Sequence, residues 1–354
     1  MLEFYVMNNS FEILAIVDNY KSAIWTERYY ESGDFELYLP ATDDNLKLFK
    51  KHQIIVRVDD ISKGMIVEKL RITTNIDEGN YLIVSGRSLS SILSRRIIWK
   101  QTTFSGLVEN TIRRIVTESL VTPDDNQRAI TNFTLGASIG LEDKLKIQFT
   151  GDNVEEAIQK LCVAFKIGYR VKLNIPGNGF IFEIYKGVDR TYNQNVVPYV
   201  VFSENFDNLL TSDYSNDQTF YKNVAQIAGE GEGTARKKVT VGQASGINRF
   251  ETFVNASDLS TNDGEVTTTD YENLLKQRGN ETLAELASTE SIDSQIAPNQ
   301  TYKLNEDYFL GDLVEIINEY GVAYTPRITE VIECQDETGF SCIPTFAVDE
   351  DAQI

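Results

Sequence analysis

The first hundred residues are dominated by side chains that alternate between apolar and polar. In the stretch DFELYLP, Phe35, Leu37 and Leu39 alternate with polar neighbours, and QIIVRVDD alternates in the same way. Because successive side chains of a strand point to opposite faces, this period of two predicts strands with one buried face. Short turn signals such as DEG separate the alternating segments. The region 1–103 therefore predicts an antiparallel sheet or barrel.

A more helical region follows. The stretch GDNVEEAIQKLCVAFKIG predicts a helix that Asp152 or Asn153 caps and that Gly168 ends. The earlier stretch SGLVENTIRRIVTESL also carries its apolar residues on one helical face. YRVKLNI and GFIFEIYKG predict a hairpin across PGNG. We therefore expect a small α+β domain at 104–200.

The end of the chain echoes its beginning at an offset of 259 residues. This offset aligns QIIVRVDD with DLVEIINE and LRITTNIDEGNY with TEVIECQDETGF, so that Ile54 meets Leu313 and Tyr81 meets Phe340. Few residues are identical, but strand, turn, strand, acidic turn and aromatic-led strand recur at one spacing. We predict an α+β, β-rich fold with two related antiparallel β-barrel domains and inserted α+β and helical segments.

These changes of pattern set the predicted domain limits. The domains are a first β-barrel at 1–103, an α+β insertion at 104–200, a second β-barrel at 201–242 and 297–348, and a loop and helical insertion at 243–296. In the last insertion, TTTDYENLLKQRGNETLAELA predicts a helix with a break or kink at Gly279.

Acidic charge is concentrated in the last part of the chain. The first 200 residues carry 24 Lys+Arg and 25 Asp+Glu, whereas the remaining 154 carry 9 and 28. This part should repel nucleic acid. It forms either a solvated surface or an acidic wall that faces a partner or a channel. The sequence has neither an apolar run of about 20 residues nor a secretory signal at its start, so we expect no membrane insertion.

The sequence offers few residues for catalysis or metal binding. His52 is the single histidine, which excludes the usual multi-histidine zinc sites, and it directly precedes an alternating strand. Cys162, Cys334 and Cys342 are expected to be free thiols. A pair of glycosidase carboxylates stays open, because 53 acidic residues offer many pairs. We predict no catalytic, cofactor-binding or metal-binding residues, and no cofactor.

The glycine-rich stretch AGEGEGTARKKVTVG resembles a phosphate loop only superficially. It lacks the Gly-Lys-Ser/Thr order, and Thr234 stands where a dinucleotide fingerprint needs glycine after Gly231. Glu230 and Glu232 would repel phosphate, and KKVTVG alternates like a strand. We predict a bend or bulge between two strands.

Four segments together resemble the tail-hub, or baseplate-hub, proteins of tailed phages and phage-like particles. They are IVDNYKSAIWTERYYESGDFELYLP, VSGRSLSSILSRRII, IAGEGEGTARKKVTVG and YFLGDLVEIINEYGVAYTPRITEVIE. Their order and spacing cover nearly the whole chain. More narrowly, the chain is similar to a tail-protein family of siphophages that infect Gram-positive hosts.

The resemblance implies a structural protein of the virion tail rather than an enzyme. It implies a homotrimer whose paired barrels make six similar modules, so that the ring joins the hexameric tail tube and distal tail proteins to a tail-tip spike or fibre. DNA would pass through the ring only in transit. The hypothesis that the acidic last third lines part of the channel comes from the charge count alone. Assembly in the host cytoplasm follows from the same resemblance.

Two other functions remain as alternatives, namely a tail-associated cell-wall hydrolase and a receptor- or carbohydrate-binding tip module. The chain ends at PTFAVDEDAQI, soon after the second predicted barrel. We therefore expect no wall-cutting extension in this polypeptide. The hub of a contractile particle is a variant of the main interpretation.

Overall fold

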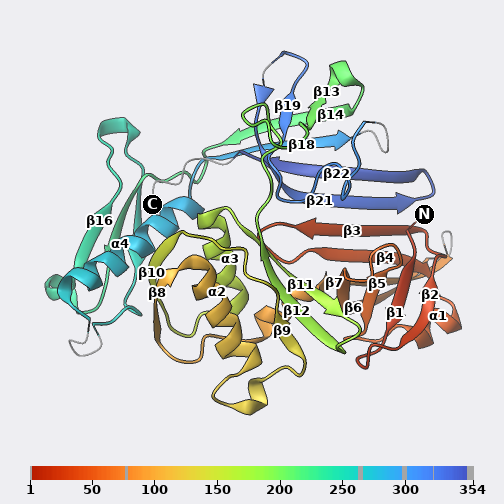
Figure 1. Ribbon diagram of the computed structural model, residues 1–354, viewed down its shortest axis with the longest axis horizontal. Coiled ribbons are helices and arrows are strands. Elements are labelled where there is room, and N and C mark those ends of the chain that lie inside the picture. Colours follow the sequence, from red (N-terminus) through yellow and green to blue (C-terminus); the bar gives the residue numbers. More distant parts are fainter. Residues whose placement is uncertain (1, 76–78, 262–265, 297–300, 322, 349–354) are drawn as a thin grey trace.

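A single antiparallel sheet of eleven strands forms the largest part of the molecule (Figure 1). The computed structural model describes residues 2–75, 79–261, 266–296, 301–321 and 323–348. The strand order is β14–β18–β22–β21–β3–β4–β7–β6–β5–β1–β2. The bounds are β1 Phe4–Met7, β2 Ile13–Val17, β3 Ser22–Arg28, β4 Asp34–Pro40, β5 Ile54–Arg57, β6 Gly64–Asn75, β7 Gly79–Ser88, β14 Leu209–Asp217, β18 Thr289–Ile296, β21 Arg327–Asp336 and β22 Gly339–Ala347.

The two ends of the chain meet in this sheet. Strand β3 pairs with β21 in a continuous register from Arg28 opposite Glu330 to Ser22 opposite Asp336. The β-rich antiparallel fold is as predicted, but the two separate barrels are not confirmed. Among the strands described, no pairing joins β2 to β14 and closes the sheet. Local alternation predicts strands and their buried faces, but it does not encode which strand edges pair.

The echo between the two ends is present at the level of hairpins. When 259 is added to the residue numbers of β7, its bounds agree with those of β22 to within one residue. Both β6–β7 and β21–β22 are antiparallel hairpins. The same shift carries β5 onto β19, Glu315–Ile317. Here the two ends differ, because β19 pairs with β13, Val201–Ser203, and with β20, Ala323–Tyr324, in a separate three-stranded sheet.

The middle of the chain packs two helices beside two small sheets. Its elements are β8 Thr102–Leu107, α2 Val108–Val116, β9 Phe133–Leu135, β10 Lys144–Phe149, α3 Val154–Phe165, β11 Gly168–Asn174 and β12 Gly179–Tyr185. Asn153 caps α3 as predicted, since its side chain accepts hydrogen bonds from the backbone of Glu155 and Glu156. The predicted end at Gly168 is wrong: Lys166 takes the left-handed conformation that stops the helix, and Gly168 already opens β11.

A further three-stranded sheet is covered on one face by the longest helix. The sheet has the order β16–β15–β17, with β15 Val224–Ala228, β16 Lys238–Val241 and β17 Glu251–Asn255, and the helix is α4, Thr268–Glu285. The predicted break at Gly279 is wrong, because α4 runs through it without interruption. A β-carbon at Gly279 would lie 2.4 Å from Ile227 Cδ1, so glycine is needed here for close packing against the sheet.

The domain limits drawn from the sequence stay a prediction.

An ion pair between the two ends of the chain reinforces the joined sheet. The Arg57 guanidinium on β5 donates to the Glu333 carboxylate on β21, and both side chains are at least 90% buried. Burial alone lowers the pKa of Arg57, but its hydrogen bond to Asp59 and the charge of Glu333 outweigh this effect and raise it. A charge that is buried with its partner depends strongly on that partner.

We expect Glu333→Ala to lower the free energy of unfolding by about 3 kcal/mol, because it leaves the Arg57 charge buried with only Asp59 beside it. Urea unfolding measures the loss. The matched control is Glu330→Ala, whose partner Arg28 lies 2.5 Å away in the same sheet but is more exposed, and there we expect about 1 kcal/mol. Equal losses in the two variants would contradict a special role for the buried pair.

Gly279→Ala should destabilise the protein by about 1–2 kcal/mol, although alanine favours helix formation by about 1 kcal/mol. The added methyl group would press on Ile227 and on Val241 Cγ2, which lies 2.7 Å from its position. Thermal unfolding of this variant is to be compared with that of Asn273→Ala, an exposed position on the same helix. A stabilising effect of Gly279→Ala would show that the helix has room to move outward.

Candidate functional site

The single histidine of the chain lies in a turn at the surface. His52 occupies an exposed turn before β5 with a positive φ of 71°, and its backbone N–H donates to the Val67 carbonyl at 2.7 Å. In the parts of the chain that the structure describes, no group of three or more His, Cys, Asp or Glu side chains is placed to hold a metal ion. None of the described helices is both long and apolar enough to cross a membrane.

The three cysteines are free thiols, as expected. Cys334 lies opposite Ser341 and Cys342 opposite Glu333, so the two cysteines of the β21–β22 hairpin point to opposite faces of the sheet. Burial raises the pKa of the Cys342 thiol to about 12 and also raises that of Cys162. Neither buried thiol supplies a thiolate nucleophile at neutral pH.

The glycine-rich stretch is a bend between two paired strands, as predicted. β15 and β16 are antiparallel, with Ala228 opposite Lys238, and the turn between them contains Gly231 and Gly233 with positive φ angles of 101° and 55°. Arg236 closes the turn by donating to the carbonyl oxygens of Ala228 and Gly229 at 2.8 and 2.7 Å. The arginine of the stretch therefore stabilises the turn itself.

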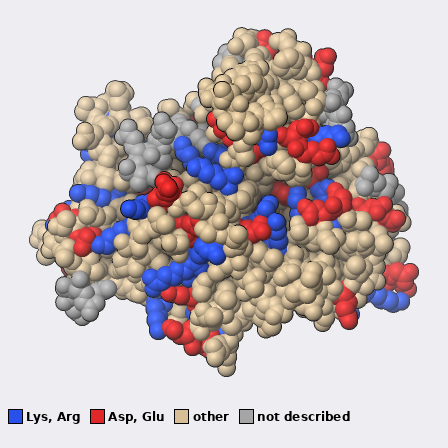
Figure 2. All heavy atoms as spheres, in the orientation of Figure 1, with Lys and Arg blue, Asp and Glu red and all other residues tan. Residues whose placement is uncertain are grey.

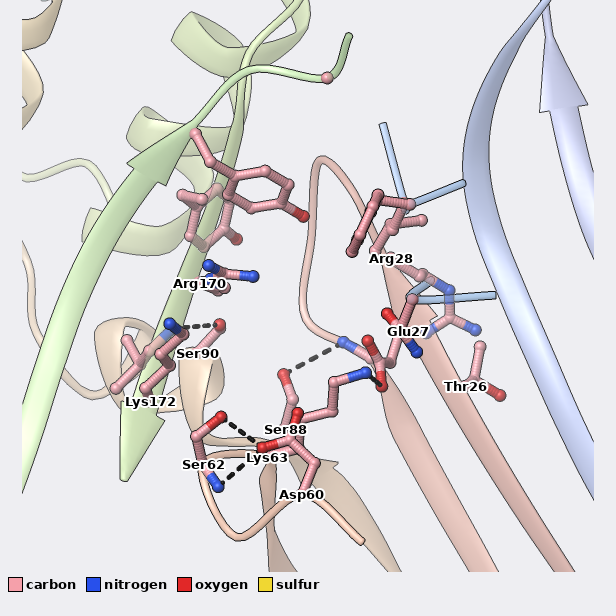
Figure 3. Close-up of a pocket in the computed structure, with 18 of the residues that line it drawn as sticks. Thr26, Glu27, Arg28, Asp60, Ser62, Lys63, Ser88, Ser90, Arg170 and Lys172 are labelled. Carbon is pink, nitrogen blue, oxygen red and sulfur yellow. Dashed lines mark hydrogen bonds and ion pairs between the residues drawn. The ribbon is translucent and has the colours of Figure 1, made fainter. Parts of the chain in front are cut away.

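A cleft of about 530 Å³ lies where three parts of the chain meet (Figure 3). The end of β3, the loop before β6, strand β11 and residues 305–312 contribute to its walls. Its serines serve to hold the backbone: Ser88 and Ser90 accept hydrogen bonds from the N–H groups of Gly33 and Val171. The Ser62 hydroxyl donates to Asp60 within one turn.

Most cations of this cleft lie against neighbouring acids. Lys63 Nζ lies 2.7 Å from Glu27 Oε1, as Figure 3 shows. Arg170 and Lys172 share Glu183 at 2.9 Å each. Arg190, deeper in the wall, lies 2.6 Å from Asp312. The cleft is therefore a charge-compensated junction between segments, and its chemistry favours a structural role.

Sequence reasoning missed these interactions between distant segments, although one signal was present. Glu333 stands two positions after Val331, which is buried, so a charge falls at an inward-facing position of an alternating strand. Arg57 occupies the same kind of position in β5, where all four residues are buried. Such a charge indicates a buried partner, but the sequence does not identify which one.

The two outer strands of the eleven-stranded sheet carry exposed apolar side chains. On β2, Ile13 and Ile16 are 54% and 58% exposed, and on β14 Leu210 is 53% exposed. Both strands have one edge without a strand partner among the described residues. On the face shown in Figure 2, acidic side chains gather mainly over the joined sheet, and a basic group lies over the region of α2 and α3. Unpaired edges with apolar residues are typical of assembly surfaces.

Comparison with known proteins identifies the family. The family model of the Siphovirus ReqiPepy6 Gp37-like proteins matches residues 3–346. A tail protein from Neisseria meningitidis MC58 has a similar structure, with a TM-score of 0.60 and 14% identity, over 98% of this chain and 97% of that one. No curated protein sequence matches the chain.

Two prophage proteins have similar structures as well. The 43 kDa tail protein of prophage MuSo2 from Shewanella oneidensis has a TM-score of 0.57 and 12% identity, over 100% of this chain and 99% of that one. The prophage tail protein gp18 from Listeria monocytogenes EGD-e has a TM-score of 0.56 and 12% identity, over 99% and 95%. At these identities the three structures establish the fold. The family match covers nearly the whole sequence, and the chain therefore belongs to the Siphovirus ReqiPepy6 Gp37-like family of phage tail proteins, as the sequence resemblance implied.

Proposed function

We propose that this chain is a structural hub of a phage or phage-like tail: a trimeric ring that joins the hexameric tail tube to the tail tip and encloses a channel for DNA. The family and the tail-protein fold support a tail location. The observation that carries the proposal is the joined sheet, to which each end of the chain contributes a similar hairpin. Two related modules in each of three chains would give a face with six similar positions.

The edges of the sheet supply a way to close such a ring. β2 ends the sheet on one side and β14 on the other, and each presents exposed apolar residues. Contact between β2 of one copy and β14 of the next would be head-to-tail. Such contacts close into a ring of three when each copy is rotated by one third of a turn relative to its neighbour. Covering the edges would also protect them from non-specific pairing.

The proposed role is assembly and gating rather than catalysis. The cleft between the segments is charge-compensated and its serines hold the backbone. Residues 201–354 contain 28 Asp+Glu but only 9 Lys+Arg. Their acidic side chains would line part of the channel and repel the DNA that passes through it. A wall-hydrolase function would instead give a clearing band in a gel that contains bacterial cell wall.

The double substitution Ile13→Lys with Ile16→Lys should weaken the trimer by about 100-fold or more, because each isoleucine buried at a contact contributes about 1.5 kcal/mol or more. Sedimentation velocity of the full chain over a range of concentrations measures the effect. Ile72→Lys is the matched control, since Ile72 is 58% exposed, like Ile16, but lies on the interior strand β6. A trimer that tolerates the double substitution as well as it tolerates the control would exclude β2 from the ring contact.

A further inference from the structure

A hollow of about 430 Å³ opens on the surface beside the start of α3. Residues 94–99 and 125–128 surround it, and its walls include Arg95, Arg96 and Arg128. We call this site the basic hollow. It is distinct from the cleft of Figure 3, whose lining residues come from other segments.

The backbone of the basic hollow is fixed. The Ile98 N–H donates to the Asp152 carbonyl at 2.8 Å, and the Arg96 carbonyl accepts from the Val154 N–H at 3.0 Å. The Asn153 side chain, which caps α3, also donates to the Ser94 carbonyl at 2.9 Å. Because the segment is anchored to the first turn of α3, the arginines are presented from a rigid platform.

The guanidinium groups of Arg96 and Arg128 bond mainly to the backbone around them. Arg96 donates to the carbonyls of Arg95 and Arg128, and Arg128 donates to the Ile97 carbonyl. The ion pairs found among the described residues include none of the three. Burial lowers the pKa of Arg96, and the positive charges of Arg128 and Arg95 lower it further.

The acids near the basic hollow have other partners. Asp124 pairs with Lys100 at 2.5 Å, and the Asp125 carboxylate accepts the Gln127 N–H. Asp125 is the only acidic residue among those that line the hollow, so its three guanidinium groups leave an excess of positive charge there. They attract an anion that can accept several hydrogen bonds at once.

The basic hollow also has an apolar wall. Trp99 is 65% exposed, and the Arg128 guanidinium carbon lies 5.0 Å from the centroid of its ring. Ile97 beside it is 39% exposed. Tryptophan and arginine are the residues that most often dominate binding energy at protein–protein contacts. The combination fits a protein surface that presents acids around an aromatic side chain.

The chain itself has such a surface at one end of the β13–β19–β20 sheet. Glu204, Phe206 and Asp207 form the turn after β13, and Glu319 and Tyr320 follow β19, which pairs with β13 in parallel. Phe206 is 51% exposed and Tyr320 82% exposed. We call these five residues the acidic knob. No ion pair among the described residues involves Glu204 or Asp207.

We propose that the basic hollow of one copy receives the acidic knob of the next copy in the ring. Carboxylates of the knob would pair with the guanidinium groups, and Phe206 or Tyr320 would pack on Trp99. Figure 1 places β13 and β19 far from β8, which directly follows the segment of the hollow, so the two surfaces of one chain are separated and the contact is between copies. The contact rests on the proposed ring and supplies it with a second, polar interface beside the sheet edges.

A nucleic acid fits the basic hollow less well, because the whole chain carries a net charge of −20 and would repel it. The acidic knob is part of the same polypeptide, so every copy that carries a basic hollow also supplies a knob for a neighbouring copy. Because the hollow and the knob are two different surfaces of one chain, the contact runs in one direction around a ring.

Reversal of charge on each side, followed by reversal on both, tests the contact. Arg95→Glu should weaken self-association of the full chain by about 10-fold, and Glu204→Arg with Asp207→Arg should weaken it by a similar factor. Combining the two sets should restore association to within about 3-fold of the original protein. Sedimentation velocity at about 0.05 M and about 0.5 M salt measures the effect, and high salt should weaken only the original and the combined variant.

Trp99→Ala tests the apolar part without a change of charge and should also weaken association by about 10-fold. Both Arg95 and Trp99 are exposed, so circular dichroism and the melting temperature should stay unchanged. Lys47→Glu is the control for net charge, since it changes the charge as Arg95→Glu does and Lys47 is exposed on the short helix α1, Asp43–Leu48; it should leave association unchanged.

The outcomes separate the two proposals. A trimer that forms equally well with Arg95→Glu and Trp99→Ala overturns the contact and leaves the ring standing. Binding of double-stranded DNA that is lost on Arg95→Glu, without an effect on association, overturns it in favour of a nucleic-acid site. A full chain that stays monomeric in solution and within isolated particles overturns both proposals.

Discussion

The pairing of β3 with β21 is the interaction on which the rest of the structure depends. It joins the first and last parts of the chain into one sheet, and the buried pair of Arg57 and Glu333 spans the same joint. Arg28 and Glu330 form a second, more exposed ion pair there. Because these contacts link residues about 300 positions apart, the segments between them are held as insertions on one joined sheet.

The same joint decides where the open edges lie. Joining the two ends through β3 and β21 leaves β2 and β14 as the outer strands. Several apolar side chains on these strands are exposed, and the ring that we propose would cover them. A frame with two unlike ends suits a head-to-tail ring better than a two-fold dimer, since a two-fold contact pairs like surfaces.

Charge is used in two ways in this molecule. In the cleft, each cation that the structure pairs lies against an acid of a neighbouring segment, so charge holds the parts of one chain together. In the basic hollow, Arg96 and Arg128 donate to backbone carbonyls, and no ion pair among the described residues involves either of them or Arg95. The difference follows from position: the cleft lies between segments that fold together, whereas the hollow lies on an outer surface.

The sequence by itself determined the strands, the turns and the absence of the common catalytic motifs. Period-two alternation located β4, β5 and β7, the Asn153 cap was readable from its place before α3, and the glycine-rich bend followed from the lack of phosphate-binding order. These features depend on neighbours in the chain, which a sequence displays directly.

Only the tertiary structure decided what lies far apart in sequence. It paired β3 with β21 where the sequence suggested two barrels, it continued α4 through Gly279 without a break, and it gave Glu333 its partner. It also gathered the three arginines of the basic hollow, which take part in no ion pair among the described residues, whereas the arginines of the cleft do. The physical reason is that side-chain pattern fixes which face of an element is buried, whereas the choice among many compatible edges and partners is made by the packing of the whole chain.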